Sequence, residues 1–368
     1  MATEGVAVRL ASFPPWWGTM HTYLLEIGFV SSTADPRVYN LDYGAVFLLL
    51  YVDDILLSGS DDEKVLRVIE KLKDRFETVD LGDAIFFLGM GIHRNLHTGT
   101  IISSQETYVR TILETYGMVD ARPTKTPAEA GPVQIEEDEI LSTEDTTLFR
   151  SATGSLLHLS RCTRPDIAHA VMILTRSMSR PGPRTVIKMK RVLRYLKGTT
   201  SIGLTHSEDA ENGDELTAYV DADHAGDMDK GYSTTGVVVC LAGAPIDWKW
   251  VKQTVVSVST LESEYVALSK ACLMVVYLRH LLKTISIKQS AATVVFEDNM
   301  SAVSTSRSNK ITPRTKHIDI KFHHVRSLVA GKVVDVKHIK AGFQKADILT
   351  KSLGAIKFIS NRLMLLGE

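Results

Sequence analysis

The chain has 368 residues, of which 44% are hydrophobic and 23% charged, and its formal net charge is −1. This composition is typical of a globular protein with two or three domains, and it excludes a disordered or low-complexity chain. A net charge near zero excludes recruitment of nucleic acid by a global electrostatic field, so any such binding needs local clusters of charge.

The apolar runs and the cysteines indicate where in the cell the protein is located. The longest aliphatic runs are too short to cross a bilayer, and "MATEGVAVRLASFPPWWGTM" lacks the continuous apolar core of a secretory signal. Three cysteines, Cys162, Cys240 and Cys272, are scattered and odd in number, which favours buried thiols over disulfides or a metal knuckle. We therefore expect an intracellular protein with no membrane partner.

In the first part of the chain, two adjacent aspartates interrupt an aliphatic run. The stretch "FLLLYVDDILLSGS" predicts two buried strands joined by a tight turn at Asp53 and Asp54. Taken alone, an ordinary turn with solvent-facing aspartates is the simpler interpretation, because short motifs recur by accident. A bound metal ion is the alternative, since unpaired carboxylates are costly inside an apolar run.

Helical periodicity follows the predicted hairpin. Apolar side chains at helical spacing predict an amphipathic helix over 63–76, and a short strand and a second helix follow over 99–118. Three prolines and the acidic run 135–139 then form a segment of loop composition. Residues from about 145 to 205 are predicted to be mainly helical.

Two basic stretches are candidates for contact with a phosphate backbone. Residues 180–198 carry seven Lys or Arg and no acidic residue, and residues 307–326 form a second cluster. A solvated helix face is the alternative interpretation of each stretch. The candidate nucleic-acid-binding residues are Arg184, Lys188, Arg191, Arg194, Arg314 and Lys316.

From about residue 214 the pattern changes to alternating strands and helices. Three successive strands, a long helix over 259–285, and two further strands separated by helices predict an α/β domain with one central mixed sheet. No internal repeat is visible in the sequence.

Four carboxylates in this last part stand where their elements meet a predicted site. Asp221 lies near the end of the first strand, and Asp298 follows the fourth strand just before a helix. Glu264 shares the core-facing stripe of the long helix with Leu268, whereas Asp347 opens the last helix.

Each of these acids alone has an ordinary interpretation as a turn, a cap or a surface residue. Glu262, for example, is expected to form a capping box with Ser259. Together, the four carboxylates predict an oxygen-rich site suited to Mg²⁺ or Mn²⁺. Two such ions about 4 Å apart can activate water and stabilise a leaving oxygen in phosphodiester hydrolysis.

The ordered motifs resemble a known family. "YVDADHAGD", "STLESEYVALSKA", "EDNMSA", "RTKHIDIKFHHVR" and "KADILTKSL" closely resemble the ribonuclease H domain of copia-type LTR retrotransposon polyproteins. Upstream, "ADPRVYN", "LLLYVDDILLSGS", "DLGDAIFFLGMGI", "GSLLHLSRCTRPDIAHAV" and "RVLRYLKGT" are similar to the palm, thumb and connection of the same family's reverse transcriptase. The resemblance covers nearly the whole chain from about Trp16.

This resemblance implies an architecture and four ligands. It implies a partial reverse transcriptase palm and thumb over 1–128 and a linker and helical connection over 129–213. A ribonuclease H-like domain with a five-stranded mixed sheet flanked by helices follows over 214–354, and a tail over 355–368. It also implies that the nuclease's two metal ions are held by Asp221, Glu264, Asp298 and Asp347.

Further positions match or depart from the family pattern. His338 stands near the position of a mobile histidine in many ribonucleases H, with an ordinary surface residue as the alternative. His224, Leu261, Ser263 and Met300 depart from the common motifs, but none of them is a proposed ligand.

For the polymerase, the resemblance implies a loss. Asp53 and Asp54 match palm aspartates, but the third aspartate and the fingers belong upstream, so we expect a truncated polymerase whose hairpin is vestigial. The implied activity is metal-dependent hydrolysis of the RNA strand of RNA:DNA hybrids, in the cytoplasm, within virus-like particles, or in the nucleus. A silent transposon relic or a domesticated nucleic-acid-binding fragment is the alternative.

Overall fold

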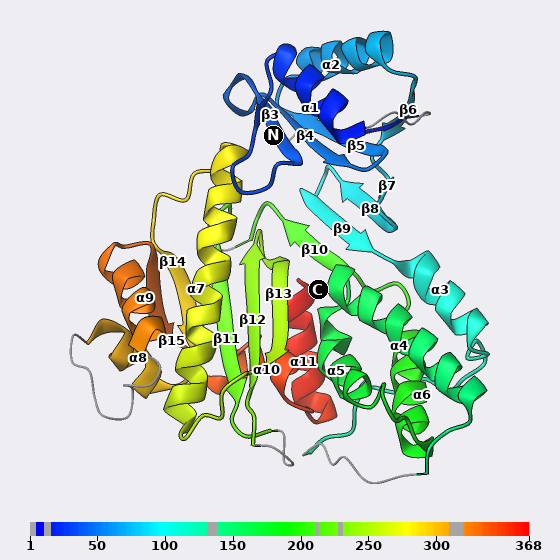
Figure 1. Ribbon diagram of the computed structural model, residues 1–368, viewed down its shortest axis with the longest axis vertical. Helices are drawn as coiled ribbons and strands as arrows, with labels where there is room; N and C mark the ends of the chain where they lie inside the picture. The colour runs from blue at the N-terminus through cyan, green and yellow to red at the C-terminus, as the bar shows by residue number, and fades with distance from the viewer. Residues whose placement is uncertain are drawn as a thin grey trace. The chain divides into compact units, whose positions relative to one another are not determined.

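The computed structural model describes residues 5–10, 16–131, 139–210, 213–226, 231–308 and 319–367. These residues form two compact units: Met1–His93 with Val276–Ser290, and Arg94–Val275 with Ala291–Glu368. Figure 1 shows both units with the labels used below.

The first unit is built on an antiparallel sheet in the order β2-β3-β4-β5-β1-β6. Side chains of β4 and β5 alternate between buried and partly exposed, as a sheet with one covered face requires. The strands are β1 (Val6–Leu10), β2 (Val30–Ser31), β3 (Val38–Leu41), β4 (Val46–Tyr51), β5 (Asp54–Gly59) and β6 (Thr78–Asp83).

Two helices accompany this sheet, α1 (Trp16–Glu26) and α2 (Asp62–Arg75), and the strands β7 (Phe86–Phe87) and β8 (Met90–Asn95) pair after it. Helix α2 confirms the predicted amphipathic helix, and the Asp61 side chain caps it by accepting a bond from the backbone N–H of Lys64 at 3.1 Å.

The second unit contains the predicted mixed sheet, in the order β13-β12-β11-β14-β15. The β11/β12 and β12/β13 pairs are antiparallel, whereas β11/β14 and β14/β15 are parallel. The strands are β11 (Thr217–Asp223), β12 (Thr234–Leu241), β13 (Ala244–Lys252), β14 (Thr293–Glu297) and β15 (Val334–His338). The expected fold class is therefore confirmed.

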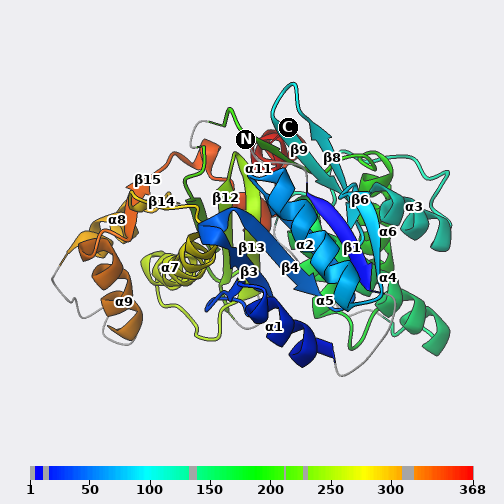
Figure 2. The ribbon, with the colours of Figure 1, turned by 90° about the horizontal axis from the view of Figure 1, so that it is seen from above.

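Helices lie on both faces of this sheet (Figures 1 and 2). Helix α7 (Thr260–Thr284) runs along one face, and α8 (Met300–Arg307) and α9 (Asp319–Ala330) pack beside β15. On the other face, α10 (Asp347–Thr350) packs against β11 and β12, and α11 (Ala355–Leu366) packs against β13.

Helix α7 is long and apolar enough to cross a membrane, alone among the helices that the structure describes. Half of its apolar window is buried inside the protein. A helix that covers a sheet in a globular core has the same composition, so its packing accounts for its hydrophobicity.

Four helices and a pair of antiparallel strands precede the sheet: α3 (Glu106–Thr115), α4 (Thr143–Cys162), α5 (Ala168–Arg176), α6 (Pro183–Lys197), and β9 (Thr100–Ser104) with β10 (Leu204–Ser207). Their buried side chains belong to the same apolar cluster as the sheet residue Val238 and Leu349 of α10. Consequently, the predicted boundaries at 128 and 213 do not separate hydrophobic cores. Loop composition there marks a break in secondary structure rather than a break in packing.

The predicted C-terminal tail over 355–368 contains a helix. Residues 355–366 form α11, whose Phe358, Leu365 and Leu366 are buried in the shared apolar cluster. Apolar residues at helical spacing in "AIKFISNRLMLL" carry this signal in the sequence.

A buried ion pair fixes the chain between α4 and α5. Arg164 donates to both carboxylate oxygens of Asp166, at 2.9 and 2.7 Å, and Tyr195 of α6 donates to the same carboxylate at 2.6 Å. The guanidinium also donates to the carbonyl of Thr199 at 2.8 Å. All charges of this network are thus paired and hydrogen-bonded, as burial requires.

Candidate metal site

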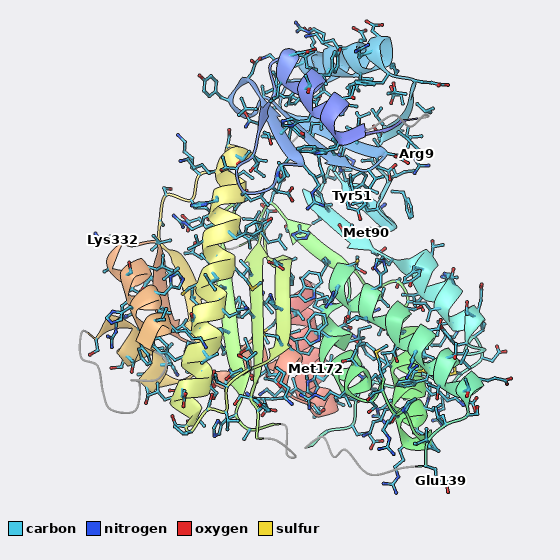
Figure 3. The ribbon with its side chains drawn as sticks, in the orientation of Figure 1. Arg9, Tyr51, Met90, Glu139, Met172 and Lys332 are labelled. Atoms are coloured by element: carbon cyan, nitrogen blue, oxygen red, sulfur yellow. The ribbon has the colours of Figure 1, made fainter. Side chains whose placement is uncertain are left out.

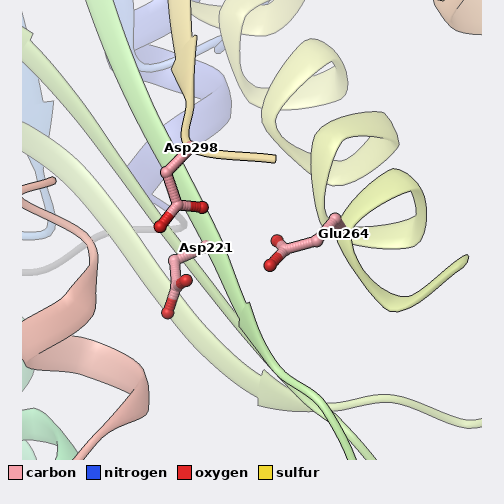
Figure 4. Close-up of side chains that lie close together, drawn as sticks. All are labelled: Asp221, Glu264 and Asp298. Carbon is pink, nitrogen blue, oxygen red and sulfur yellow. The ribbon is translucent and has the colours of Figure 1, made fainter. Parts of the chain in front are cut away.

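Three carboxylates converge at the end of the mixed sheet. Parallel pairing sets Val220 of β11 beside Glu297 of β14, so Asp221 and Asp298 follow at adjacent positions. Each of Asp221, Glu264 and Asp298 offers a ligand oxygen, and these three atoms lie within 4.8 Å of one another. Figure 4 shows Glu264 pointing from α7 toward the two aspartates.

Burial makes these carboxylates hard to ionise. Asp221 is fully buried and Glu264 is 7% exposed. Burial, followed by the charges of Glu297, Asp221 and Asp298, raises the pKa of Glu264 to about 11. Burial also raises the pKa of Asp221 to about 6, and that of Asp298 above its usual value.

Glu297 is a further acid that the sequence-based prediction missed. Its side chain is fully buried; one oxygen accepts a bond from the Asn299 N–H at 3.0 Å, and the other has no partner among the described residues. Burial raises its pKa well above the usual value. The signal was present in the sequence, because Thr293, Val295 and Glu297 share the buried phase of β14.

The donor set fits a divalent cation. Oxygen Oε2 of Glu264 is buried without a partner among the described residues, and a buried carboxylate of this kind calls for a cation or a proton. Carboxylate oxygens are the ligands that Mg²⁺ and Mn²⁺ prefer. Asp221, Glu264 and Asp298 are therefore the residues that could hold such an ion.

Asp347, the fourth predicted ligand, lies apart from this set of converging oxygens. It is buried at the start of α10, where Lys351 Nζ donates to its Oδ1 at 2.8 Å and Lys357 Nζ to its Oδ2 at 2.5 Å. The same Lys351 nitrogen lies 2.8 Å from Asp221 Oδ1. Although burial alone would lower it, the carboxylates of Asp221 and Asp347 raise the pKa of Lys351.

The structure also places His338 and the predicted capping residues Ser259 and Glu262. His338 is exposed at the end of β15. At the start of α7, Ser259 Oγ accepts a bond from the Glu262 N–H at 3.3 Å. The Glu262 carboxylate, however, accepts from the Val258 N–H at 2.8 Å, one residue before the expected donor.

The palm-like hairpin lies in the first unit, and its turn differs from the predicted one. Asp54 pairs with Tyr51 across the strands, so Val52 and Asp53 form the turn, with Val52 at a φ of +52°. Arg9 of β1 lies opposite Asp54, and its Nε donates to Asp54 Oδ1 at 2.9 Å. Figure 3 labels Arg9 and Tyr51.

A metal site at this hairpin needs a third ligand. Among the described residues, neither Asp53 nor Asp54 belongs to a group of three such ligands. The neighbouring strand instead presents a guanidinium to Asp54, and the two side chains form an ion pair.

The first basic stretch forms α6 and borders a hollow. Arg184, Lys188, Arg191 and Arg194 help to line a cavity of about 600 Å³. Arg191 is already paired with Glu129 at 3.0 Å, and Arg194 donates to a backbone carbonyl at 2.7 Å. The other two candidates, Arg314 and Lys316, lie outside the described residues.

A second cavity, of about 320 Å³, lies beside Lys351. Lys351 lines it together with Asp223 and Met172, the α5 residue labelled in Figure 3. Gly131 and Ser352 line both cavities. The cavity beside α6 and the cavity beside Lys351 are therefore neighbours.

Comparisons with known proteins agree with the motifs. Residues 8–130 match the reverse transcriptase (RNA-dependent DNA polymerase) family. The chain is 33% identical over 352 residues to the Retrovirus-related Pol polyprotein from transposon TNT 1-94 of Nicotiana tabacum, covering 93% of this chain and 26% of the polyprotein. It is 30% identical over 258 residues to a transposon Ty5-1 protein of Saccharomyces cerevisiae, covering 69% of this chain and 82% of that protein.

Among solved structures, LC11-RNase H1 in complex with an RNA/DNA hybrid aligns with 37% of this chain and 94% of its own. The identity is 17% and the TM-score 0.28.

The sequence matches define a class, the reverse transcriptase polyproteins of transposons. Within it, the chain belongs to the copia-type retrotransposon Pol family. It spans about a quarter of the length of the tobacco polyprotein.

Raising the pH should destabilise the metal-free protein. In the unfolded chain these carboxyl groups release their protons near pH 4, whereas the native pKa is about 6 for Asp221 and about 11 for Glu264. The native state therefore holds more protons than the unfolded state from about pH 4 to about pH 11, and the free energy of unfolding falls as the pH rises through this window. In EDTA, calorimetry should show a shallower decline of Tm with pH for Glu264→Gln than for the wild type.

The exposed Glu106 supplies a matched control on α3. Its carboxylate accepts from Arg110 at the surface, and Glu106→Gln should keep the wild-type dependence of Tm on pH. Equal slopes for Glu264→Gln and the wild type would contradict the raised pKa of Glu264.

Proposed function

We propose that the second unit hydrolyses the RNA strand of RNA:DNA hybrids with a divalent ion, Mg²⁺ or Mn²⁺, held by Asp221, Glu264 and Asp298. The convergence of these three oxygens within 4.8 Å carries the proposal. Family membership supports it, because the motifs that contain these residues resemble the ribonuclease H segment of copia-type polyproteins.

The ion, when bound, would activate a water molecule and stabilise charge on the phosphate that is cleaved. Asp221 and Asp298 would hold it at the sheet edge, where two strand ends fix their side chains. Glu264 would complete the donor set from α7 and would give up the proton favoured by its raised pKa. Binding of the metal therefore becomes stronger as the pH rises.

Nucleic acid would approach through the hollow beside α6. Arg184 and Lys188 are exposed there, one helical turn apart, and both line the larger cavity. Contacts from such residues to phosphates position a duplex without reading its bases. The shared lining at Ser352 would lead the hybrid's backbone toward the carboxylates.

We further infer that the hairpin at Asp53 and Asp54 no longer supports polymerisation. The salt bridge from Arg9 to Asp54 supports this, because a cation is bound where a metal-binding palm would need a free carboxylate.

Replacing Asp298 with Asn should abolish hybrid cleavage. The substitution removes one of three ligands, and it spares the fold because it removes a half-buried charge that burial and neighbouring acids already disfavour. A labelled RNA:DNA hybrid in Mg²⁺ or Mn²⁺, with an EDTA control, measures cleavage, and calorimetry measures Tm. Asp335→Asn, on β15 of the same sheet, is the matched control, and this variant should cleave the hybrid as fast as the wild type does.

Undiminished cleavage by Asp298→Asn would remove the site assignment. Binding of the hybrid by the wild type without metal-dependent cleavage would instead support a fragment that only binds nucleic acid.

Replacing Arg184 and Lys188 together with Ala should weaken hybrid binding equally for all sequences. Losing two phosphate contacts should reduce the slope of log K against log salt by about 2. Fluorescence anisotropy over a salt series measures both quantities. Arg67 and Lys71 on α2 have the same spacing and exposure, so their double Ala variant is the matched control. Equal salt slopes for the two double variants would contradict a nucleic-acid path along α6.

Primer extension should be undetectable with the wild-type chain. Its background should equal that of an Asp53→Asn, Asp54→Asn double variant in either Mg²⁺ or Mn²⁺, because Arg9 already forms an ion pair with Asp54. Extension by the wild type that the double variant loses would show that the hairpin is active.

A further inference from the structure

Lys351 places an ammonium group between two of the predicted metal ligands. Its Nζ lies 2.8 Å from Asp221 Oδ1 and 2.8 Å from Asp347 Oδ1. One nitrogen thus bridges two carboxylates from β11 and α10. This is the arrangement that a bridging cation would adopt.

The remaining oxygens of both carboxylates are also bound by the chain. Asp221 Oδ2 accepts a bond from the Thr350 hydroxyl, and Asp347 Oδ2 accepts from Lys357 Nζ at 2.5 Å. All four oxygens therefore have donors within the protein. A divalent ion between Asp221 and Asp347 would have to displace at least the Lys351 ammonium.

The end of helix α10 places Thr350 and Lys351 beside the two carboxylates. Helix α10 ends at Thr350, and Lys351 follows it in an extended conformation, at i+4 from Asp347. The two aspartates are fully buried, whereas the Lys351 side chain is 37% exposed. The lysine therefore reaches the carboxylates from the side of the cavity that it lines.

The three converging carboxylates are different. Glu264 Oε2 has no partner among the described residues, and its ligand atom lies within 4.8 Å of those of Asp221 and Asp298. The residues thus fit one divalent ion at this set, whereas a second ion at Asp347 does not fit the contacts that surround it. The two-ion site implied by the resemblance is not reproduced there.

We propose that the ammonium group of Lys351 permanently occupies the position of the second divalent ion. The chain then loads one divalent ion, at Asp221, Glu264 and Asp298, and Asp347 serves as the counter-ion of Lys351 rather than as a ligand. This inference rests on the proposed metal site, and it specifies which positive charges occupy that site: one divalent ion and the Lys351 ammonium.

The number of bound ions tests the proposal without any substrate. Mn²⁺ is titrated into the metal-free full chain, and bound ions are counted by calorimetry. Electron paramagnetic resonance then distinguishes an isolated Mn²⁺ ion from a coupled pair. The wild type should bind one Mn²⁺ that is lost in Asp298→Asn, with no coupled signal.

Substitutions at Lys351 should change this count in a charge-dependent way. Lys351→Met removes the ammonium at similar volume and should admit a second, coupled Mn²⁺. Adding Asp347→Asn to that variant should return the count to one. Lys351→Arg keeps the positive charge and should bind one ion, as the wild type does. Circular dichroism confirms that each variant is folded.

The possible failures are distinguishable. A coupled Mn²⁺ pair in the wild type, reduced to a single ion by Asp347→Asn, would overturn the role of Lys351 while leaving the proposed nuclease site in place. Wild-type Mn²⁺ binding that Asp298→Asn does not alter would overturn the metal site itself. If Lys351→Met does not fold, the wild-type count and the Lys351→Arg count decide the matter.

Discussion

Repulsion among buried carboxylates is the interaction on which the second unit depends. Asp221, Glu264, Glu297 and Asp298 gather at the end of one sheet, and burial penalises the charge of each. Such a cluster persists only if protons, metal ions or basic side chains compensate its charge. Lys351 supplies one positive charge beside Asp221, and the raised pKa of Glu264 favours the protonated form of that side chain.

Periodicity in the sequence predicted the sheet and much of this site. Alternation of buried residues located β11 and β14, and their parallel pairing brings Asp221 beside Asp298. Glu264 followed from its place on the core-facing stripe of α7. Glu297 was missed, although the two-residue period of buried side chains in β14 includes it.

Other features depend on contacts between segments that sequence periodicity does not encode. The helix at Asp347 ends after four residues, and only the fold shows that Lys351 then reaches Asp221 on another element. The hairpin turn was displaced by one residue because strand pairing placed Asp54 opposite Tyr51. The predicted boundaries likewise followed loop composition, whereas compact units are set by shared apolar contacts.

Two aspartates in this chain each pair with a basic side chain, but the two pairs differ in burial. Arg9 meets Asp54 near the surface, where the carboxylate side chain is 26% exposed and water screens the pair. Lys351 meets Asp221 where the carboxylate is fully buried. In the second setting the surrounding acids have a much stronger influence on one another, because the local dielectric response is weaker.

The continuous apolar cluster between α4 to α6 and the sheet has a consequence for where the chain can be divided. Val238 of β12 and Leu349 of α10 belong to the same cluster as buried residues of helices that precede the mixed sheet in sequence. Cutting the chain at the predicted boundary near residue 213 would expose apolar side chains of this cluster to water. The helices α4 to α6 and the mixed sheet therefore depend on one hydrophobic core, and a cut between them would remove part of that core from both sides.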